Sequence, residues 1–261
     1  MIMTTTFKQI YTNLLSGKLA FPRGQKIVEL ENYQYSLEPY HRFANFPPAR
    51  KLNVDYIKKE FLWYLRGDRY DASITEHAAL WKSIMNEDGS FNSNYGQYFF
   101  GEQQQFDIVL DILKNDKDSR RASILLLTKD HVSSITKDVP CTYALNFRIR
   151  DNQVNMSVHM RSQDAIYGMG NDAPAFSILH EMMFNALKEF YPDIEYGIYT
   201  HTVDSLHVYE KHFKMLSDIY ASDYEKVECP KISGYNEVKF LRQLNFDVIP
   251  KEYQFTKWLV S

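Results

Sequence analysis

Two runs of alternating apolar and polar residues lie in the middle of the chain, at Thr142–Arg150 and Gln153–Arg161. Alternation with a period of two predicts half-buried β-strands. The Asp151–Asn152 pair between the runs is typical of a two-residue hairpin turn, because Asn tolerates a positive φ. Such a turn places Arg161 opposite Thr142 and Ser162 opposite Cys141. The apolar positions expected on one face are Tyr143, Leu145, Phe147 and Ile149 in the first run and Val154, Met156, Val158 and Met160 in the second.

Apolar residues at helical spacing mark three segments in the first half of the chain. Residues Thr4–Leu15 predict a short amphipathic helix. Asn53 is suited to cap a second helix that runs through Arg66, and Gly67 is suited to end it. The third helix is expected over Gln105–Asn115.

Further strands are expected at Ile27–Tyr35, Ser123–Thr128 and Tyr196–His201, where short apolar or alternating stretches occur. Ala173–Tyr191 is apolar nearly all round, which predicts a buried central helix with Pro174 in its first turn.

The pattern after residue 201 favours one more helix. Asp204 or Ser205 would cap it, and it would continue through Ile219. Beyond Ala221 the pattern predicts little.

Length and composition narrow the class of protein. The 261 residues contain no Pro/Gly/Ser-rich linker and no repeat, so one domain over residues 1–261 is expected. A net charge of −3 argues against broad nucleic-acid binding, which requires a basic face. The two cysteines, Cys141 and Cys229, fit a reducing cytoplasm without a disulfide framework. No apolar run approaches transmembrane length, the start lacks a signal-peptide pattern, and we assign no metal ligands.

The hairpin register brings a thiol, a guanidinium and a hydroxyl together at its open end, from Cys141, Arg161 and Ser162. Asp164 follows three residues after Arg161. Taken singly, a cysteine after a proline is more often an inert thiol, and a lone arginine is more often a solvated charge. The combination raises the expectation of a functional site.

Several ordered motifs in this region resemble the thymidylate synthase superfamily. They are Pro140–Cys141, Arg161–Ser162 with Asp164, Gly168, and His207 with Tyr209. Within that superfamily the chain is similar to bacteriophage deoxycytidylate hydroxymethylases, on the evidence of Met160–Ser162, Asn171–Asp172 and Ser205–Tyr209. The similarity runs from about Arg23 to Phe213. It implies an α+β domain with a large twisted mixed sheet, covered by helices, and a sheet face that forms a dimer interface.

The resemblance also implies a reaction. Cys141 would add to C6 of a pyrimidine nucleoside monophosphate, so that C5 attacks the one-carbon unit of 5,10-methylenetetrahydrofolate. A nearby Arg161 would favour the thiolate by lowering its pKa. Glu60 would be the general acid or base, since a half-buried carboxylate has a raised pKa, and with Tyr95 it would handle water. Trp81, together with Asp164 and Gly168, would line the folate pocket. On its own, Glu60 would be read as solvated.

Phosphate and sugar contacts follow from the same resemblance. Arg23 would contact the substrate phosphate from a flexible lid, alongside Arg161. Arg120 and Arg121, which alone would be read as a solvated loop, suit bidentate phosphate recognition and would reach into the partner's site of a homodimer. His207 and Tyr209 would bind the 3′-hydroxyl, and Ser162 and Asp164 would complete the substrate site.

Base recognition is assigned to Asp172, at the position of the uracil-reading Asn of thymidylate synthases. A carboxylic acid matches cytosine, whose N3 accepts and whose amino group donates. Two alternatives stay open: Asp172 could be the N-cap of the following helix, or Asn171 could read the base.

The sequence departs from the synthase pattern at four positions. Met160 replaces the usual Gln, Thr142 the usual His, Gly170 the usual Pro, and Asp204–Ser205 the usual Gly-Asp. The leading hypothesis is therefore a deoxycytidylate hydroxymethylase. Thymidylate synthase, a deoxyuridylate hydroxymethylase and a ribocytidylate hydroxymethylase are alternatives. A non-enzymatic nucleotide-binding or RNA-binding regulator is disfavoured, because such a protein would be expected to lose the cysteine.

Overall fold

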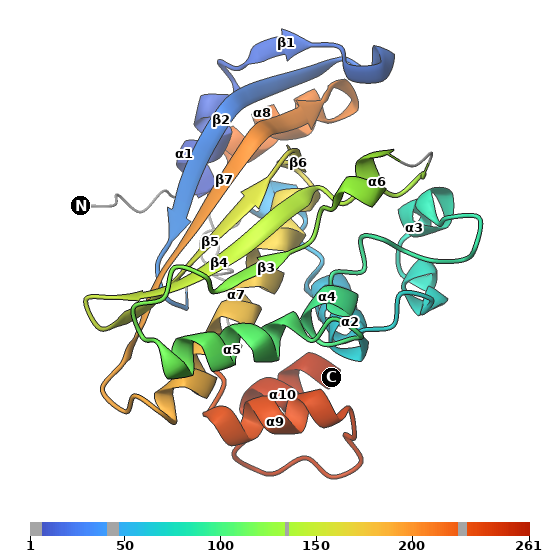
Figure 1. The fold of residues 1–261 in the computed structure, drawn as a ribbon. Helices are drawn as coiled ribbons and strands as arrows, with labels where there is room; N and C mark the ends of the chain where they lie inside the picture. Colours follow the sequence, from blue (N-terminus) through green and yellow to red (C-terminus); the bar gives the residue numbers. More distant parts are fainter. Residues whose placement is uncertain (1–6, 41–46, 134–135, 224–228) are drawn as a thin grey trace.

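The computed structural model describes residues 7–40, 47–133, 136–223 and 229–261. These residues form a seven-stranded sheet in the order β1-β2-β7-β5-β4-β3, with the short β6 paired to β7 (Figure 1). The strands are β1 Lys18–Ala20, β2 Ile27–Leu37, β3 Ser123–Leu125, β4 Thr142–Arg150, β5 Gln153–Met160, β6 Gln163–Asp164 and β7 Glu195–Tyr209. β7 pairs in parallel with β5 and β6, and the other pairs are antiparallel. The sheet is therefore mixed, and the expected α+β class is confirmed.

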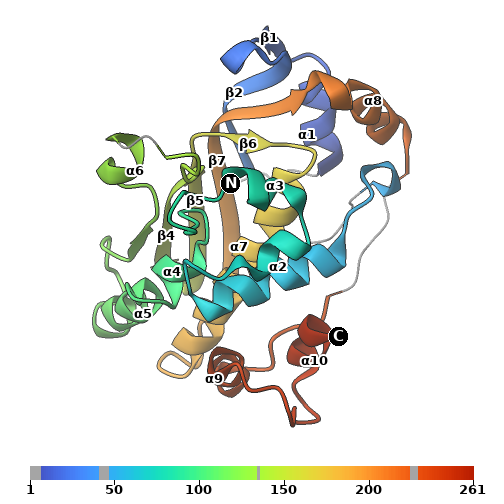
Figure 2. The same cartoon turned by 90° about the vertical axis from the view of Figure 1, so that its right-hand side faces the viewer.

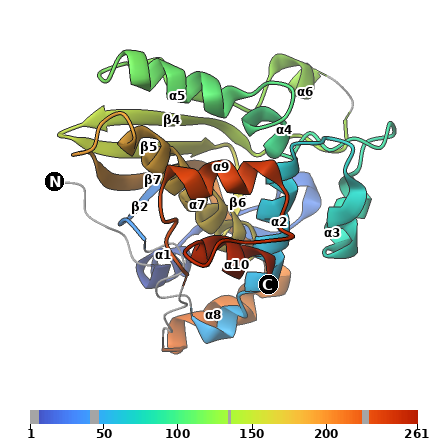
Figure 3. The same ribbon diagram turned by 90° about the horizontal axis from the view of Figure 1, so that it is seen from below.

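The helices gather mainly along one side of the sheet and at its lower end (Figures 1 and 3). They are α1 Phe7–Leu14, α2 Val54–Arg66, α3 Ala79–Ile84, α4 Gly96–Phe99, α5 Gln105–Asn115, α6 Lys129–Ser133, α7 Gly168–Lys188, α8 Phe213–Ala221, α9 Tyr235–Gln243 and α10 Gln254–Val260. Short 3₁₀ turns occur at η1 Pro22–Gly24, η2 Pro48–Arg50, η3 Ala72–Glu76 and η4 Glu210–His212. None of the described helices is long and apolar enough to cross a bilayer.

Three predicted helices are confirmed with nearly the expected bounds. Asn53 caps α2 by accepting the Tyr56 N–H at 3.0 Å, and Gly67 ends the helix with a φ of 64°. α5 has the predicted bounds, and α1 runs from Phe7, since the earlier residues lie outside the described part of the chain. At these sites the local capping residues and the apolar periodicity agree with the packing of the fold.

The central hairpin is present and keeps the predicted register from Arg150–Gln153 to Ala144–His159, but its open end departs from that register. Asp151 and Asn152 both have positive φ, as a two-residue turn requires. A β-bulge between Thr142 and Ala144 then shifts the pairing by one residue, so that Thr142 lies opposite Met160. Tyr143 is the extra residue. It is 37% exposed, and the expectation that it shares the buried face with Leu145 was wrong.

The long helix α7 begins earlier than predicted, at Gly168 rather than Ala173. Pro174 consequently lies in its interior and not in its first turn, and Asp172 is a helical residue and not an N-cap. α7 is buried on nearly all sides, packed against the sheet and against α2, α5 and α9. The Arg50 guanidinium packs against Gly170, and a Cβ at this position would lie 2.5 Å from Arg50 Nη2, so a larger residue would require the Arg50 side chain to move.

The helix predicted to start near Asp204 is instead the second half of β7, which continues to Tyr209. Its residues pair with β2 over the whole register from Leu37–Tyr199 to Ile27–Tyr209. The apolar residues in this stretch fitted a helical spacing by coincidence, and strand pairing on both sides overrides that local preference. The helix α8 starts only at Phe213.

Candidate active site

The open end of the central hairpin is organised around Cys141 and Arg161. Because of the bulge, Arg161 and not Ser162 lies opposite Cys141, and its N–H donates to the Cys141 carbonyl at 2.8 Å. The guanidinium donates from Nε to the Pro140 carbonyl at 3.0 Å and from Nη2 to the Val139 carbonyl at 2.8 Å. Nη2 also lies 3.6 Å from Cys141 Sγ. Arg161 therefore fixes the loop that carries the thiol and contacts the sulfur itself.

The thiol is not activated in the way the sequence suggested. Burial raises the pKa of Cys141 above its ordinary value of 9.0. The positive charges of Arg161 and Arg23 lower it, and the negative charges of Asp172 and Asp138 raise it further. The expected depressed pKa is thus wrong for the protein without substrate, because burial outweighs the two arginines.

Arg23, Asp164, His207 and Tyr209 approach the same end of the sheet. β6 pairs Asp164 with His207, and the His207 ring lies edge-on to Tyr209 with 5.0 Å between centroids. Burial raises the pKa of Tyr209, and a hydrogen bond from Arg23 acts in the opposite direction. Arg23 adopts a left-handed φ of 51° in η1, so this exposed arginine is held in a conformation that few non-glycine residues adopt.

Ser162 and Gly168 border this region. Ser162 and Arg161 are the two residues between β5 and β6. A Cβ on Gly168 would lie 3.5 Å from Asp172 Oδ2 and 3.7 Å from Asp164 Cβ. At the start of α7, Gly168 therefore places backbone without a side chain beside the Asp164 and Asp172 side chains.

Glu60 belongs to a chain of hydrogen bonds on α2 and α3. Trp81 Nε1 donates to the Tyr56 hydroxyl at 2.8 Å, and this hydroxyl donates to Glu60 Oε1 at 2.8 Å. Glu60 is 5% exposed. Burial, together with the charge of Asp172, raises the pKa of Glu60 to about 8, and the Tyr56 hydrogen bond lowers it. In Figure 2, α3 lies above α2 on the side toward the viewer.

Asp172 points toward the same interior from α7. Gln163 Nε2 donates to Asp172 Oδ2 at 3.0 Å, and Gln163 Oε1 accepts from the Tyr35 hydroxyl at 3.2 Å. Burial raises the pKa of Asp172 to about 7. Its charge in turn raises the pKa of Cys141 and of Glu60, so the carboxylate lies near enough to act on both groups. Asn171 lies about 100° further round the helix, so the two side chains do not face the same point.

Tyr95 is enclosed by aromatic rings and by the loop before Cys141. Its ring stacks on Phe176 and Tyr64 at centroid distances of 5.9 and 5.7 Å. Burial, and then the nearby Cys141, raise the pKa of Tyr95 well above its ordinary value. Asp138 ties the two loops together, because its carboxylate accepts from the N–H of Ser93 at 2.8 Å and from the Ser93 hydroxyl.

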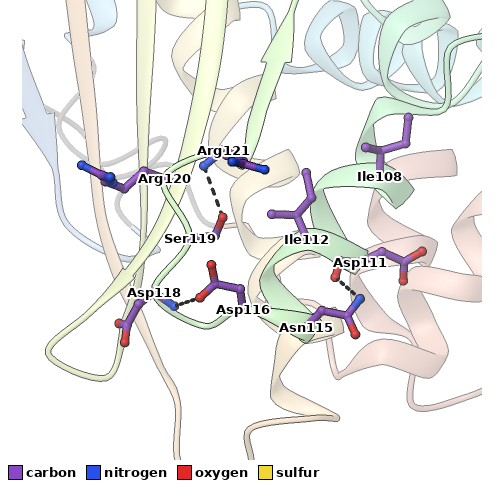
Figure 4. A pocket seen from close by; sticks show the side chains of 9 residues that line it. All are labelled: Ile108, Asp111, Ile112, Asn115, Asp116, Asp118, Ser119, Arg120 and Arg121. Carbon is purple, nitrogen blue, oxygen red and sulfur yellow. Dashed lines mark hydrogen bonds between the residues drawn. The ribbon is translucent and has the colours of Figure 1, made fainter.

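Arg120 and Arg121 lie away from this cluster, on a surface groove between α5 and the loop that leads to β3 (Figure 4). The two side chains point in different directions, with Arg121 above α5 and Arg120 toward the strands. Arg120 also lines a second groove on the face of the sheet, beside Asn146, Arg148, Ser157 and His159. Neither guanidinium forms an ion pair with the carboxylates of the described residues.

The structure thus brings eleven of the predicted residues to one end of the sheet, around Cys141: Arg23, Glu60, Trp81, Tyr95, Arg161, Ser162, Asp164, Gly168, Asp172, His207 and Tyr209. It leaves Arg120 and Arg121 on a separate surface of the same chain.

Sequence reasoning missed Tyr56, Gln163 and Asp138. Tyr56 lies four residues before Glu60 on one helix, a spacing that could have revealed it, and Gln163 stands inside the Ser162–Asp164 motif.

The fold and this arrangement define the class of protein. The chain belongs to the thymidylate synthase family, whose family model matches residues 21–257.

Curated relatives include phage hydroxymethyltransferases. The deoxyuridylate hydroxymethyltransferase of Bacillus phage SP01 is 27% identical over 255 residues, which cover 88% of this chain and 65% of that protein. The deoxycytidylate 5-hydroxymethyltransferases of Enterobacteria phages T6 and T4 are each 31% identical over 175 residues. Those alignments cover 63% of this chain and 71% of each relative. The chain therefore spans only about two thirds of the length of these proteins. These findings confirm the resemblance inferred from the motifs.

Proposed function

We propose that this protein is a pyrimidine-nucleotide C5 hydroxymethyltransferase that converts dCMP to 5-hydroxymethyl-dCMP with 5,10-methylenetetrahydrofolate. The observation that carries the proposal is a carboxyl group, Asp172, with a pKa near 7, whose charge acts on the half-buried Cys141 thiol and on Glu60, a second carboxyl group with a raised pKa. Perturbed pKa values that converge in one site are typical of acid–base chemistry.

Cys141 is the proposed nucleophile. The thiol first loses its proton to solvent water, and the thiolate then adds to C6 of the pyrimidine, so that C5 becomes an enamine carbon that can attack a one-carbon electrophile. After the new C–C bond forms, loss of the C5 proton and departure of tetrahydrofolate would leave an exocyclic methylene on a ring that is still bonded to sulfur. The C–S bond breaks only after water has added to that methylene. Arg161, 3.6 Å from Sγ, stabilises the thiolate as it develops and keeps the loop of Pro140 in place.

Asp172 is the proposed reader of the base. In its protonated form the OH donates to N3 of cytosine, and the other oxygen accepts from the 4-amino group. Uracil reverses both groups and would leave unsatisfied or opposed polar atoms, a mismatch that costs about 1–3 kcal/mol per group. A pKa near 7 keeps a large fraction of Asp172 protonated at neutral pH. It also lets the residue pass its proton to N3, which becomes more basic when sulfur adds at C6.

Glu60 and Tyr95 are the proposed water-handling pair for the second half of the reaction. Addition of water to the exocyclic methylene gives the hydroxymethyl product, and this step needs a group that can give and take a proton. Glu60, with a pKa near 8, can do both at neutral pH.

The folate supplies a one-carbon unit at the oxidation level of formaldehyde. The residues beside this site suit such a ligand. Trp81 offers an indole ring that packs edge-on against Trp63 and Phe91, and Gly168 leaves space beside Asp164 that a side chain would fill. We assign Trp81, Asp164 and Gly168 to this part of the site.

Phosphate binding is assigned to Arg23 and Arg161, with Arg120 and Arg121 supplied by a second copy of the chain. Two arginines without ion-pair partners among the described residues, on grooves away from their own Cys141, support a composite site in a homodimer. The polar face of the sheet that Arg120 borders is the proposed interface. His207, Tyr209 and Ser162 would complete the sugar and phosphate contacts.

A second candidate is the same reaction on dUMP, which is favoured by the similarity to the phage SP01 protein over most of this chain. Mass spectrometry of the products from dCMP, CMP and dUMP, each with the folate donor, tests both candidates. We expect a hydroxymethyl product, formed preferentially from dCMP, and we expect Asp172→Asn to shift the preference toward dUMP. A methylated product, or a wild-type preference for dUMP or CMP, would overturn the assignment.

A further inference from the structure

Gln163 connects the Asp172 carboxylate to the buried interior of the sheet. It is 2% exposed, and both ends of its amide are engaged: Nε2 donates to Asp172 Oδ2 at 3.0 Å, and Oε1 accepts from the Tyr35 hydroxyl at 3.2 Å. Tyr35 is 1% exposed and is itself held by stacking on His201, with 4.8 Å between centroids and 13° between planes. The amide therefore has a fixed orientation.

The orientation matters because the two ends of an amide are not equivalent. The NH₂ group only donates hydrogen bonds, so the Asp172 oxygen that it faces, Oδ2, must accept. When Asp172 is protonated, its proton must then lie on the other oxygen, Oδ1. A turn of the amide would place its oxygen against Asp172 and its NH₂ against Tyr35, and the Tyr35 hydroxyl proton would lose its acceptor on Gln163.

We propose that Gln163, held in place by Tyr35, is a positioning residue that fixes the Asp172 proton on Oδ1 and thereby makes the site select cytosine over uracil. This inference rests on the proposed reading of the base by Asp172. Oδ1–H then donates to N3 of cytosine. Oδ2 has two lone pairs, so it can accept from the 4-amino group and from Gln163 at the same time. With uracil, Oδ1–H would face the N3–H donor and Oδ2 would face the O4 acceptor.

The first test measures binding, so that it does not depend on turnover. Dissociation constants of dCMP and dUMP are compared for the full-length protein without folate, in the wild type, Gln163→Met and Tyr35→Phe. Gln163→Met keeps the length of the side chain and removes its polar atoms, and Tyr35→Phe removes one oxygen. Gln243→Met, at an exposed position at the end of α9, is the matched control.

We expect Gln163→Met to reduce the preference for dCMP over dUMP about tenfold, the equivalent of one hydrogen bond in a buried site. Tyr35→Phe should reduce the preference in the same direction by a smaller factor, and the control should not change it. Equal losses of affinity for both nucleotides in Gln163→Met would mean a merely structural role and would overturn the proposal.

The second test follows the carboxyl carbon of Asp172 by ¹³C NMR as a function of pH. The Gln163 hydrogen bond lowers the Asp172 pKa, so Gln163→Met should raise that pKa, and Gln243→Met should not. An unchanged Asp172 pKa would overturn the proposal. Parallel substitutions control for the other titratable or charged groups that act on Asp172 or are acted on by it: Glu60 from α2, Asp164 from β6, Cys141, Tyr35, Tyr64, Tyr95 and Tyr199.

The failure of this inference and that of the proposed reaction look different. A wild type that prefers dCMP but keeps that preference in Gln163→Met rejects the role of Gln163 alone. A protein that binds dCMP preferentially, loses the preference in Gln163→Met and forms no hydroxymethyl product supports the role of Gln163 and rejects the proposed reaction. A wild type that prefers dUMP rejects both.

Discussion

Replacing Glu60 with Gln should stabilise the protein while it removes the proposed acid–base group. Glu60 is 5% exposed, and burial raises its pKa to about 8 from an ordinary value of 4.5. A buried carboxyl group is tolerated when it is protonated, and ionising it costs free energy. Gln cannot ionise, and its oxygen can still accept from the Tyr56 hydroxyl, which donates to Glu60 Oε1 at 2.8 Å. The substitution therefore removes a pH-dependent cost and keeps the local hydrogen bond.

The magnitude follows from the two pKa values. The pKa of Glu60 is higher in the folded protein than in the unfolded chain. Between pH 4.5 and about pH 8 the folded protein therefore binds more protons than the unfolded chain, and the free energy of unfolding falls as the pH rises through this range. Relative to a residue that stays neutral, Glu60 costs about 1 kcal/mol at pH 5, about 3 kcal/mol at pH 7 and about 5 kcal/mol at pH 9. The free energy of unfolding of Glu60→Gln should exceed that of the wild type by a margin that grows in this way.

Urea unfolding at equal protein concentrations and at pH 5, 7 and 9 measures the effect, since association would otherwise change the apparent stability. Glu237→Gln is the matched control. Glu237 is also fully buried, but its oxygens accept from the Ser233 N–H and from the N–H and hydroxyl of Thr256. An NH₂ group there would oppose a donor, so Glu237→Gln should lower stability at every pH. A difference between Glu60→Gln and the wild type that does not change with pH would refute the reasoning.

Three further predictions concern the proposed chemistry. Cys141→Ala should lower turnover by several orders of magnitude and leave nucleotide binding within a few-fold, and turnover near the wild-type rate would exclude the covalent mechanism. Arg121→Ala and Cys141→Ala should each be inactive alone. A mixture of the two proteins should recover activity after subunit exchange, because a hybrid dimer contains one intact site. A monomer in sedimentation at micromolar concentration would refute the shared site. Tyr56→Phe removes the hydroxyl donor that lowers the Glu60 pKa. The limb of the kcat/KM profile against pH that reports Glu60 should therefore move upward by about one pH unit. An unchanged profile would argue against this contact.

Elements set by local chemistry were predictable from the sequence. The Asn53 cap, the Gly67 terminus and the positive φ values at Asp151 and Asn152 all depend on neighbouring residues only. The strand β7 was not predictable in its full length. Its second half has an apolar spacing that also fits a helix, and pairing with β2, nearly 180 residues away in the chain, decides the outcome.

In the candidate site, too, the residues could be identified from the sequence, but their geometry depends on tertiary structure. The motif positions identified Cys141, Arg161 and Asp172 as neighbours, yet their mutual geometry depends on a one-residue bulge at Tyr143 that no pattern in the sequence indicates. The start of α7 at Gly168 resolves one open alternative, because Asp172 cannot cap a helix that begins four residues before it. The raised thiol pKa was missed because sequence alone names the nearby arginine and does not give the degree of burial.

Charge balance explains how a thiol with a raised pKa can serve in this site. In the proposed reaction the thiolate is needed only while sulfur bonds to C6, and the C–S bond then removes its negative charge. Asp172, with a pKa near 7, passes its proton to N3 of cytosine in the same step and becomes the carboxylate. Loss of the thiol proton therefore creates one negative charge, and the addition step moves that charge from sulfur to Asp172 without creating a second one. The Arg161 guanidinium, 3.6 Å from Sγ, stabilises the charge while it is on sulfur, so a thiol that is protonated in the free protein can still add once cytosine is bound.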